Sequence, residues 1–366
     1  MTVDMDDMKL IITGGGTGGH IFPGLAVAKE LLDKKKGHDI LWVGARRGME
    51  SQMVPGQGIE YIPLSVTGLK GKGMLYKIAS LANLARAFVQ SLGIIRRYQP
   101  DVVLGVGGYA SGPMGLAAIF TGKPLALAEQ NAVPGLTNKW LGKWAKAVFV
   151  SWPGMERHFP QGKVELTGNP VRREFALIKD RADDGKLNIL IAGGSQGASA
   201  VNSAVMEASR LMAHLAGRVA IIHQTGRADL EKVAAAAKAS SLDWKPEAFL
   251  ENMGEKLEWA DLVISRAGAG AVSEICAAGR AAVYIPYPRA AGDHQAANAG
   301  PSVSEGAAIL IREAVLTPES LAGVILDLER DRRKVKEMGA KARNLGRPHA
   351  ASMMAGLLAE LAGEAV

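Results

Sequence analysis

The sequence predicts an α/β protein that contains two doubly wound parallel sheets. Short apolar segments alternate with longer segments of helical pattern along the whole chain, which is typical of βαβ units. Several apolar segments run directly into glycine-rich loops, and the pattern of the first half restarts at Leu187. Because ligands of doubly wound sheets bind outside the carboxyl ends of the strands, we expect the functional residues in the loops that follow the strands.

The composition limits the class of protein. A chain of 366 residues is long enough for two domains of ordinary size. The single cysteine, Cys276, excludes a disulfide framework and is expected to be a small buried residue. The formal net charge of +7 favours anionic partners, namely nucleic acid, phosphorylated small molecules or an anionic membrane surface, and does not choose among them. We expect no signal peptide and no membrane-spanning segment.

The first half begins with a strand at Lys9–Thr13, the glycine-rich loop Gly14–His20 and a helix expected from Pro23 to Lys35. This order lets a ligand approach the loop backbone closely, and proline suits the first turn of a helix. The loop is not a P-loop, because no Gly-Lys-Ser/Thr sequence follows it. A dehydrogenase is also disfavoured, since Asp39 precedes the strand Ile40–Val43 instead of ending it.

A basic and apolar segment follows the strand Tyr61–Leu64, and it contains no acidic residue as far as Pro100. Its apolar residues recur in steps of three and four, which predicts a helix that packs on the sheet. These residues are Met74, Ile78, Leu81, Ala85, Phe88, Leu92 and Ile95. The segment Lys70–Tyr76, which includes Lys72, combines charge with large apolar residues, so contact with an anionic lipid surface is an alternative for it.

Four more strands complete the first half. Asp101–Leu104 leads into a second glycine loop, Gly105–Pro113, and Pro124–Ala128 ends at Glu129-Gln130-Asn131. The last two strands are expected at Val148–Ser151 and Val164–Leu166.

The segment Thr167–Arg173 is predicted to be a linker, because Asn-Pro blocks regular structure. After it, the strand Leu187–Ala192, the loop Gly193–Ala198 and a helix repeat the order of the first half. We therefore place one Rossmann-like domain at residues 8–167 and a second at residues 168–346. Further strands of the second domain are expected at Val219–Gln224, Glu247–Leu250, Leu262–Ser265 and Ala282–Ile285.

The end of the chain is predicted to be helical. A long helix is expected at Pro318–Leu345, and Pro348 ends it. Residues 347–362 are expected to contain an amphipathic helix that packs back onto the first domain.

The turn after the strand Leu262–Ser265 is a candidate nucleotide site. It is rich in glycine and alanine, and a helix follows whose free N–H groups and positive dipole end suit a phosphate. The carboxylate of Glu274 can accept two hydrogen bonds from a diol such as that of ribose. An ordinary βα turn, in which Glu274 merely complements the dipole, is the alternative.

No metal site is expected. The Cys and His residues lack zinc spacing, and no Asp-x-Asp sequence lies at a strand end. A bound diphosphate would then be neutralised by helix N-termini and arginines, of which Arg172 and Arg266 are candidates. Arg266 can equally be a structural arginine that bonds to carbonyl groups.

Seven motifs occur in order along nearly the whole chain: GGGTGGHIFPGLAVA, GVGGYASGP, EQNAVPGLTNK, TGNPVR, GGSQGA, SRAGAGAVSE and DHQAANA. Together they resemble the MurG family of undecaprenyl-diphospho-muramoylpentapeptide β-N-acetylglucosaminyltransferases. The resemblance implies a GT-B fold, with two Rossmann-like domains that face each other across a cleft. It also implies inverting transfer of GlcNAc from UDP-GlcNAc to the C4 hydroxyl of MurNAc in lipid I, which forms lipid II.

The same resemblance implies a cellular setting. The enzyme would need no cofactor and no metal at the donor site, and no nucleic acid partner. It would bind peripherally to the anionic cytoplasmic face of the inner membrane through its first domain. Through peptidoglycan synthesis it would serve cell wall biogenesis, cell shape, cell division and the cell cycle.

In the first domain, the resemblance places Thr17, Gly18 and Gly19 at the donor sugar and diphosphate. Asn131 would also contact the donor. His20 is the candidate general base, because its ordinary pKa suits proton transfer near neutral pH. Glu129 is its rival, and a purely structural His20 is the alternative.

In the second domain, the resemblance places Arg172 and Ser195 beside the diphosphate, and backbone groups of Leu250 beside the uracil. Gln295 would bind near the GlcNAc hydroxyls, and Glu274 would bind the ribose. Diphosphate and ribose would lie along Ala269, Gly270, Ala271, Val272, Ser273 and Glu274.

The chain departs from the family pattern at three places. Gly270 and Ala271 stand where a hydroxyl residue is often expected, so backbone N–H groups would have to replace a side-chain bond to phosphate. Ala128 stands where a histidine commonly precedes Glu-Gln-Asn, and Ala281 replaces a proline.

Two other classes of function stay open. A UDP-GlcNAc 2-epimerase would share the nucleotide site, and it would need acid and base carboxylates around the sugar, for which Glu129 is one candidate. A non-catalytic nucleotide-sugar-binding partner of a membrane complex is the second.

Overall fold

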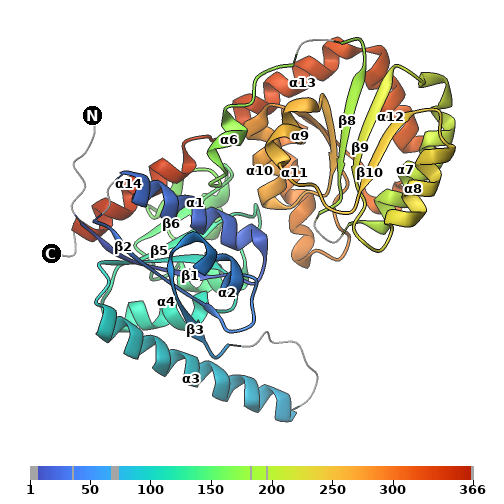
Figure 1. Ribbon diagram of the computed structural model, residues 1–366. Helices are drawn as coiled ribbons and strands as arrows, with labels where there is room; N and C mark the ends of the chain where they lie inside the picture. Colours follow the sequence, from blue (N-terminus) through green and yellow to red (C-terminus); the bar gives the residue numbers. More distant parts are fainter. Residues whose placement is uncertain (1–6, 35–36, 67–73, 182–183, 195–196, 364–366) are drawn as a thin grey trace. The chain divides into compact units, whose positions relative to one another are not determined.

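The computed structural model describes residues 7–34, 37–66, 74–181, 184–194 and 197–363, with side chains of residues 74–81 excepted. The chain forms two compact units (Figure 1). Unit 1 comprises Met1–Val171 and His349–Val366, and unit 2 comprises Arg172–Pro348.

Unit 1 is built on a seven-stranded parallel sheet with the strand order β3-β2-β1-β4-β5-β6-β7. The order reverses between β1 and β4, so the loops that follow these two strands lie at the switch point where doubly wound sheets bind ligands. The strands are β1 (Lys9–Gly14), β2 (Asp39–Ala45), β3 (Glu60–Leu64), β4 (Val102–Gly107), β5 (Leu125–Glu129), β6 (Ala147–Val150) and β7 (Val164–Leu166).

Six α-helices in the described part of unit 1 cover this sheet. They are α1 (Gly18–Lys34), α2 (Glu50–Met53), α3 (Met74–Tyr98), α4 (Ser111–Phe120), α5 (Leu136–Leu141) and α14 (Ala350–Gly363). Helix α14 lies beside α1 although more than 300 residues separate them in the sequence (Figure 1). Met354, Ala355 and Leu358 enter the core of unit 1, and Lys34 Nζ donates to Ser352 Oγ at 2.8 Å.

Helix α1 begins five residues earlier than the sequence predicts. The N–H groups of His20 and Ile21 already bond to the carbonyl oxygen of Thr17, at 3.1 and 3.2 Å. Pro23 therefore lies inside the helix, where it is buried, and not in its first turn. The correction places His20 in the first turn of α1, next to the glycine loop.

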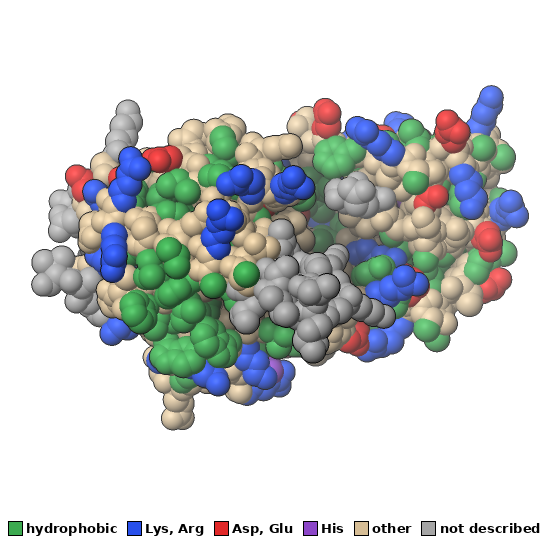
Figure 2. Space-filling view, turned by 90° about the horizontal axis from the view of Figure 1, so that it is seen from below, with side chains coloured by type: hydrophobic (Ala, Val, Ile, Leu, Met, Phe, Trp, Pro, Cys, Tyr) green, Lys and Arg blue, Asp and Glu red, His purple; other side chains and the backbone are tan. Residues whose placement is uncertain are grey.

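Helix α3 exposes part of its predicted apolar face. Ile95 is buried and Phe88 is half-buried as expected, whereas Ala85 is exposed, because Ala87 and Ser91 turn inward instead. Figure 2 shows hydrophobic side chains gathered on the face that carries α3, with Lys and Arg side chains around them. Helices α3 and α4 pack together, and they expose the apolar side chains of Leu84 and Val89 on α3 and of Phe120 on α4. Lys70, Lys72 and the side chains of Met74, Ile78 and Leu81 lie outside the described part.

Unit 2 is built on a six-stranded parallel sheet with the order β10-β9-β8-β11-β12-β13. Its strands are β8 (Leu187–Ala192), β9 (Val219–Gln224), β10 (Asp243–Glu247), β11 (Leu262–Ser265), β12 (Ala281–Tyr284) and β13 (Ala308–Leu310). The strand predicted at Glu247–Leu250 is wrong. Since β10 is an edge strand with one neighbour, it tolerates Pro246, and Trp244 anchors it in the core.

Eight α-helices lie in the described part of unit 2. They are α6 (Arg173–Ala176), α7 (Ser199–Leu211), α8 (Leu230–Ala239), α9 (Met253–Trp259), α10 (Ala269–Ala278), α11 (His294–Ser304), α12 (Pro318–Arg330) and α13 (Arg332–Leu345). The long helix predicted at Pro318–Leu345 is two helices. Asp331 leaves the helical conformation, and its carboxylate accepts a hydrogen bond from Lys334 N at 3.0 Å, which starts α13.

Candidate active site

The glycine loop after β1 is held against the glycine loop after β4. Gly15 has a φ of +148°, which side-chain-bearing residues rarely adopt, and its N–H donates to the carbonyl of Gly107 at 3.1 Å. Trp42 Nε1 donates to the carbonyl of Gly14 at 3.1 Å. Ser111 Oγ lies 2.8 Å from the carbonyl oxygen of Thr13 and accepts from Gly107 N at 3.1 Å. These bonds fix the two loops at the switch point of the sheet.

A buried carboxylate, which the sequence did not indicate, completes this arrangement. Glu50 at the start of α2 is 1% exposed. Its Oε2 accepts from Gly16 N at 2.9 Å, and its Oε1 accepts from Ala45 N at 3.0 Å. Both partners are backbone groups, so no residue pattern in the sequence points to this role.

His20 lies at the mouth of the loop. Its Nδ1 is 3.1 Å from the carbonyl oxygen of Gly15 and 3.4 Å from Thr17 Oγ1. Because a carbonyl oxygen only accepts, Nδ1 carries the proton, and Nε2 of the neutral ring keeps its lone pair. Thr17 and Gly19 are exposed beside it, and Gly18 is half-buried. The structure thus brings the residues predicted in this loop together, with one ring nitrogen ready to accept a proton.

Glu129 is placed differently from His20. Its side chain is 3% exposed. Oε1 accepts from the backbone N and the Nδ2 of Asn131, at 3.0 and 3.3 Å, and Oε2 accepts from Gly135 N and Asn138 Nδ2, both at 3.0 Å. Four hydrogen bonds occupy both oxygens, so the geometry favours a role in holding the loop of Asn131 over a role as base.

In unit 2, the turn after β11 presents an open helix N-terminus. Gly268 occupies the N-cap position and has no side chain with which to cap the helix. The first backbone bond of α10 runs from Val272 N to Gly268 O at 3.0 Å, so the N–H groups of Ala269, Gly270 and Ala271 precede it. Apart from the adjoining residues and the helix's own backbone, no described atom lies within 4 Å of a Cβ built on Gly268 or Gly270. This terminus has the charge and the space to receive a phosphate.

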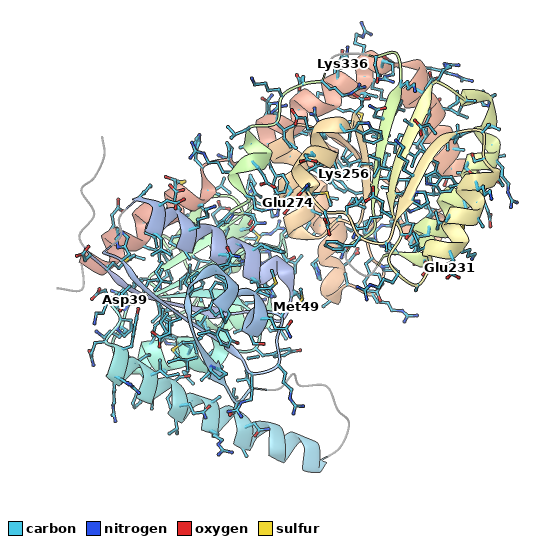
Figure 3. All side chains as sticks on the ribbon, viewed as in Figure 1. Asp39, Met49, Glu231, Lys256, Glu274 and Lys336 are labelled. Atoms are coloured by element: carbon cyan, nitrogen blue, oxygen red, sulfur yellow. The ribbon has the colours of Figure 1, made fainter. Side chains whose placement is uncertain are left out.

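Glu274 and Arg172 are brought together in unit 2, and Figure 3 labels Glu274 on α10. Burial raises the pKa of Glu274 to about 7, the positive charge of Arg172 opposes this shift, and Glu174 adds to it. Arg172 pairs with Glu174 at 3.1 Å and lies 4.4 Å from the ring centre of Phe175. The charge of Arg172 therefore acts on the carboxyl group of Glu274, although the two predicted donor-site residues lie far apart in the sequence.

Arg266 is a structural arginine. Its Nη1 donates to the carbonyl oxygens of Ile285 and Pro286 at 3.1 and 3.2 Å, and its Nη2 pairs with Glu313 at 2.5 Å. These partners tie the end of β11 to the end of β12. Of the two open roles of Arg266, the geometry supports the structural one.

The remaining predicted residues of unit 2 follow strand ends at the same edge of the sheet. Leu250 comes after β10 and is 3% exposed. Val272 is buried within α10, and Ser273 is half-buried. Gln295 lies in the first turn of α11, which follows β12, and its Oε1 accepts from Tyr287 N at 2.9 Å, which orients the amide. Ser195 lies outside the described residues.

Within the described ranges, no group of three or more His, Cys, Asp or Glu side chains is arranged to hold a metal ion.

Two family models match the chain. The model of the glycosyltransferase family 28 N-terminal domain matches residues 10–150, and that of the C-terminal domain matches residues 188–354. The chain belongs to glycosyltransferase family 28. The predicted α/β fold class, with two Rossmann-like parallel-sheet domains of the GT-B type, is confirmed.

Relatives in family 28 match nearly the full chain. A protein of Myxococcus xanthus, named UDP-N-acetylglucosamine–N-acetylmuramyl-(pentapeptide) pyrophosphoryl-undecaprenol N-acetylglucosamine transferase, is 41% identical over 97% of this chain and 93% of its own. A protein of the same name from Syntrophus aciditrophicus is 42% identical, over 94% of this chain and 96% of its own length. The crystal structure of Acinetobacter baumannii MurG has a TM-score of 0.81 and 34% identity, and covers 96% of this chain and 99% of that one. The resemblance inferred from the seven motifs is confirmed.

The fold is shared with a second class of enzyme. UDP-GlcNAc 2-epimerase from Neisseria meningitidis, solved with UDP-GlcNAc, matches this family 28 chain with a TM-score of 0.67 over 96% of it and 99% of the epimerase. The two are 14% identical, so the match shows a common fold.

Proposed function

We propose that this protein transfers GlcNAc from UDP-GlcNAc to the C4 hydroxyl of MurNAc in undecaprenyl-diphospho-MurNAc-pentapeptide, with inversion at the anomeric carbon. The product is the lipid-linked disaccharide, lipid II. The similarity to transferases of this name over nearly the whole chain carries the proposal. The open N-terminus of α10 and the accessible ring of His20 support it.

The donor nucleotide is assigned to unit 2. The N–H groups of Ala269 to Ala271 bind the diphosphate, and Arg172 adds a positive charge beside them. Glu274 accepts hydrogen bonds from the ribose hydroxyls, and backbone groups of Leu250 bind the uracil. Gln295 binds the GlcNAc hydroxyls, and Ser195 binds the diphosphate.

Acceptor activation is assigned to unit 1. Nε2 of His20 takes the proton of the C4 hydroxyl, and that oxygen forms a bond to the anomeric carbon as the bond to the diphosphate breaks. The electron pair of the broken bond leaves with UDP, whose added charge the α10 N-terminus stabilises. Attack from the side opposite the leaving group inverts the anomeric centre. In this proposal Thr17, Gly18 and Gly19 contact the donor sugar and the diphosphate, Asn131 contacts the donor, and Glu129 holds the loop of Asn131.

Membrane association is assigned to unit 1 as well. Exposed apolar residues of α3 and α4 lie on a face with basic residues around it (Figure 2). On α5 and the turn after it, Trp140 and Trp144 are about half exposed, with Lys139 and Lys143 exposed beside them. Such a surface suits peripheral binding to the anionic cytoplasmic face of the inner membrane, where peptidoglycan synthesis supports cell growth, shape and division. Sedimentation with anionic but not with zwitterionic vesicles tests this assignment.

None of the helices in the described ranges is long and apolar enough to cross a membrane.

The decisive experiment measures GlcNAc transfer from labelled UDP-GlcNAc to a lipid I analogue, with and without the acceptor. Acceptor-dependent release of UDP and formation of the disaccharide are expected. Interconversion of UDP-GlcNAc without acceptor would indicate an epimerase instead. Binding of UDP-GlcNAc without either reaction would indicate a non-catalytic binding protein.

A further inference from the structure

Glu50 lies behind the glycine loop that carries His20, and the reaction steps above do not use it. We propose that Glu50 is a positioning residue, which fixes the orientation and the tautomer of His20 for proton transfer. This inference rests on the proposed transferase function, in which His20 is the base.

The link between the two side chains is a single peptide unit. The N–H of Gly16 donates to Glu50 Oε2 at 2.9 Å, and the C=O of Gly15 faces His20 Nδ1 at 3.1 Å. These N–H and C=O groups belong to the same peptide bond, which is planar. Rotation of this peptide would therefore break both contacts together. The carboxylate holds the peptide plane, and the peptide plane directs its carbonyl oxygen at the imidazole.

Glu50 polarises the peptide between Gly15 and Gly16 in the direction that helps His20 to act as a general base. A carboxylate that accepts the N–H of a peptide makes its carbonyl oxygen a better acceptor, because hydrogen bonds in a chain strengthen one another. That carbonyl holds the proton of His20 on Nδ1, so Nε2 of the neutral ring keeps its lone pair. The arrangement performs, through one peptide, the orienting task that a directly bonded carboxylate performs in a catalytic triad.

The surrounding glycines make room for this carboxylate. A Cβ built on Gly15 would lie 2.2 Å from Glu50 Cδ, and one on Gly48 would lie 2.1 Å from Glu50 Oε2. A Cβ on Gly44 would lie 2.8 Å from Glu50 Cγ. Side chains at all three positions are incompatible with the carboxylate where it stands. The second oxygen bonds to Ala45 N at 3.0 Å, which fixes the carboxylate to the end of β2.

Glu50→Gln tests the proposal with almost no change in volume. The amide keeps one acceptor oxygen but turns an NH2 group toward one of the two backbone N–H donors, so the clamp on the peptide is lost. We expect kcat for transfer to fall about 10- to 100-fold, because small displacements of a catalytic group have effects of this size. The Kd for UDP is expected to stay within about twofold, since Arg172, α10 and Glu274 are unchanged.

A double-mutant cycle with His20→Ala separates positioning from general damage. If Glu50 acts through His20, Glu50→Gln changes kcat by less than about threefold in the His20→Ala background. An equal loss in both backgrounds, or wild-type kcat in the Glu50→Gln variant, would overturn the proposal. Glu329→Gln is the matched control, since Glu329 is also buried, pairs with Arg218 in unit 2, and is expected to affect the melting temperature but not kcat.

A measurement on the wild-type protein covers the case in which Glu50→Gln does not fold. Nitrogen NMR of the His20 ring, assigned with His20→Ala, is expected to show the proton of the neutral form on Nδ1. The opposite tautomer would overturn the proposal. This result does not depend on transfer, so a wild type that transfers nothing would refute the proposed function separately.

Discussion

Gly14 and Gly15, at the start of the loop between β1 and α1 in unit 1, are closely surrounded by neighbouring groups, whereas Gly268 and Gly270 in the turn between β11 and α10 of unit 2 are open. In unit 1, the Glu50 carboxylate accepts from Gly16 N, Trp42 Nε1 donates to the carbonyl of Gly14, and His20 Nδ1 lies at hydrogen-bond distance from the carbonyl oxygen of Gly15. In unit 2, apart from the adjoining residues and the helix's own backbone, Gly268 and Gly270 have no described atom within 4 Å of a built Cβ. Both loops follow a strand next to the switch point of a doubly wound sheet.

The difference reflects the two tasks that we assign to these loops. A proton acceptor must be held at one position and in one tautomer, which requires bonded and packed neighbours. A diphosphate is bound by a row of backbone N–H groups and a dipole, which require free space. A family 28 chain can therefore use the same strand–glycine–helix segment twice, with opposite surroundings.

Removal of the base is the largest expected effect on the crowded loop. His20→Ala is expected to lower kcat about 10²- to 10⁴-fold, the usual contribution of a general base. UDP binding, measured by calorimetry, should stay nearly unchanged, because the His20 side chain is not among the groups that we assign to the nucleotide. A variant with wild-type kcat would show that His20 only shapes the loop, and the two loops would then not differ in task.

A methyl group added to the crowded loop is expected to damage the fold. Gly15→Ala forces a side chain into a φ of +148° and against the Glu50 carboxylate, so it should destabilise unit 1 by about 2–4 kcal/mol. Thermal unfolding measures this loss. Wild-type stability would mean that the loop relaxes freely, contrary to the bonds described here.

Glu274 is expected to serve binding and to oppose stability. Glu274→Ala should weaken UDP binding by about 1.5–3 kcal/mol, the value of a hydrogen bond to a charged group. In the wild type, UDP affinity should rise as the pH passes about 7, because burial raises the pKa of Glu274 to about 7 and the ionised form accepts better. Equal affinity of variant and wild type at pH 8 would refute the ribose assignment.

The same pKa shift has a consequence for unfolding. The folded carboxyl keeps its proton where the unfolded one, with a pKa near 4.5, has lost it. Its contribution to stability is therefore complete below about pH 4.5 and is lost as the pH rises through 7. Glu274→Gln should consequently unfold at a higher temperature than the wild type at pH 8, with a smaller difference at pH 5.

The smallest expected effect is a methyl group added to the open turn. Gly270→Ala is expected to stabilise unit 2 by about 0.4–1 kcal/mol, because alanine restricts the unfolded chain and meets no neighbour. The expected change in the free energy of unfolding is opposite in sign to that of Gly15→Ala, and thermal unfolding of both variants in parallel compares the two changes directly. Destabilisation by Gly270→Ala would show that the turn is not open.

The sequence was sufficient for the fold class and for the position of most candidate residues after strand ends, because both follow from strand–loop–helix order. The roles of these residues stay predictions. It failed where tertiary partners decide. Asp331 caps α13 and divides a continuous helical pattern, and the edge position of β10 admits Pro246. Arg266 stayed undecided since its carbonyl partners have no sequence signature.

Glu50 shows the same limit within the site. It bonds to two backbone N–H groups, and any residue can supply such a group. The sequence offered Glu129 as a possible base, and only the structure shows that four donors already bond to its two carboxylate oxygens.

The return of helix α14 to unit 1 determines the order in which the protein can be completed during synthesis. Met354, Ala355 and Leu358 belong to the same core as β1 and α1, yet the ribosome makes them after all of unit 2. At about 5–20 residues per second, the first strand waits roughly 17–70 s for the last helix of its unit. Until α14 has been made, the apolar surface of unit 1 that Met354, Ala355 and Leu358 cover stays exposed on the nascent chain.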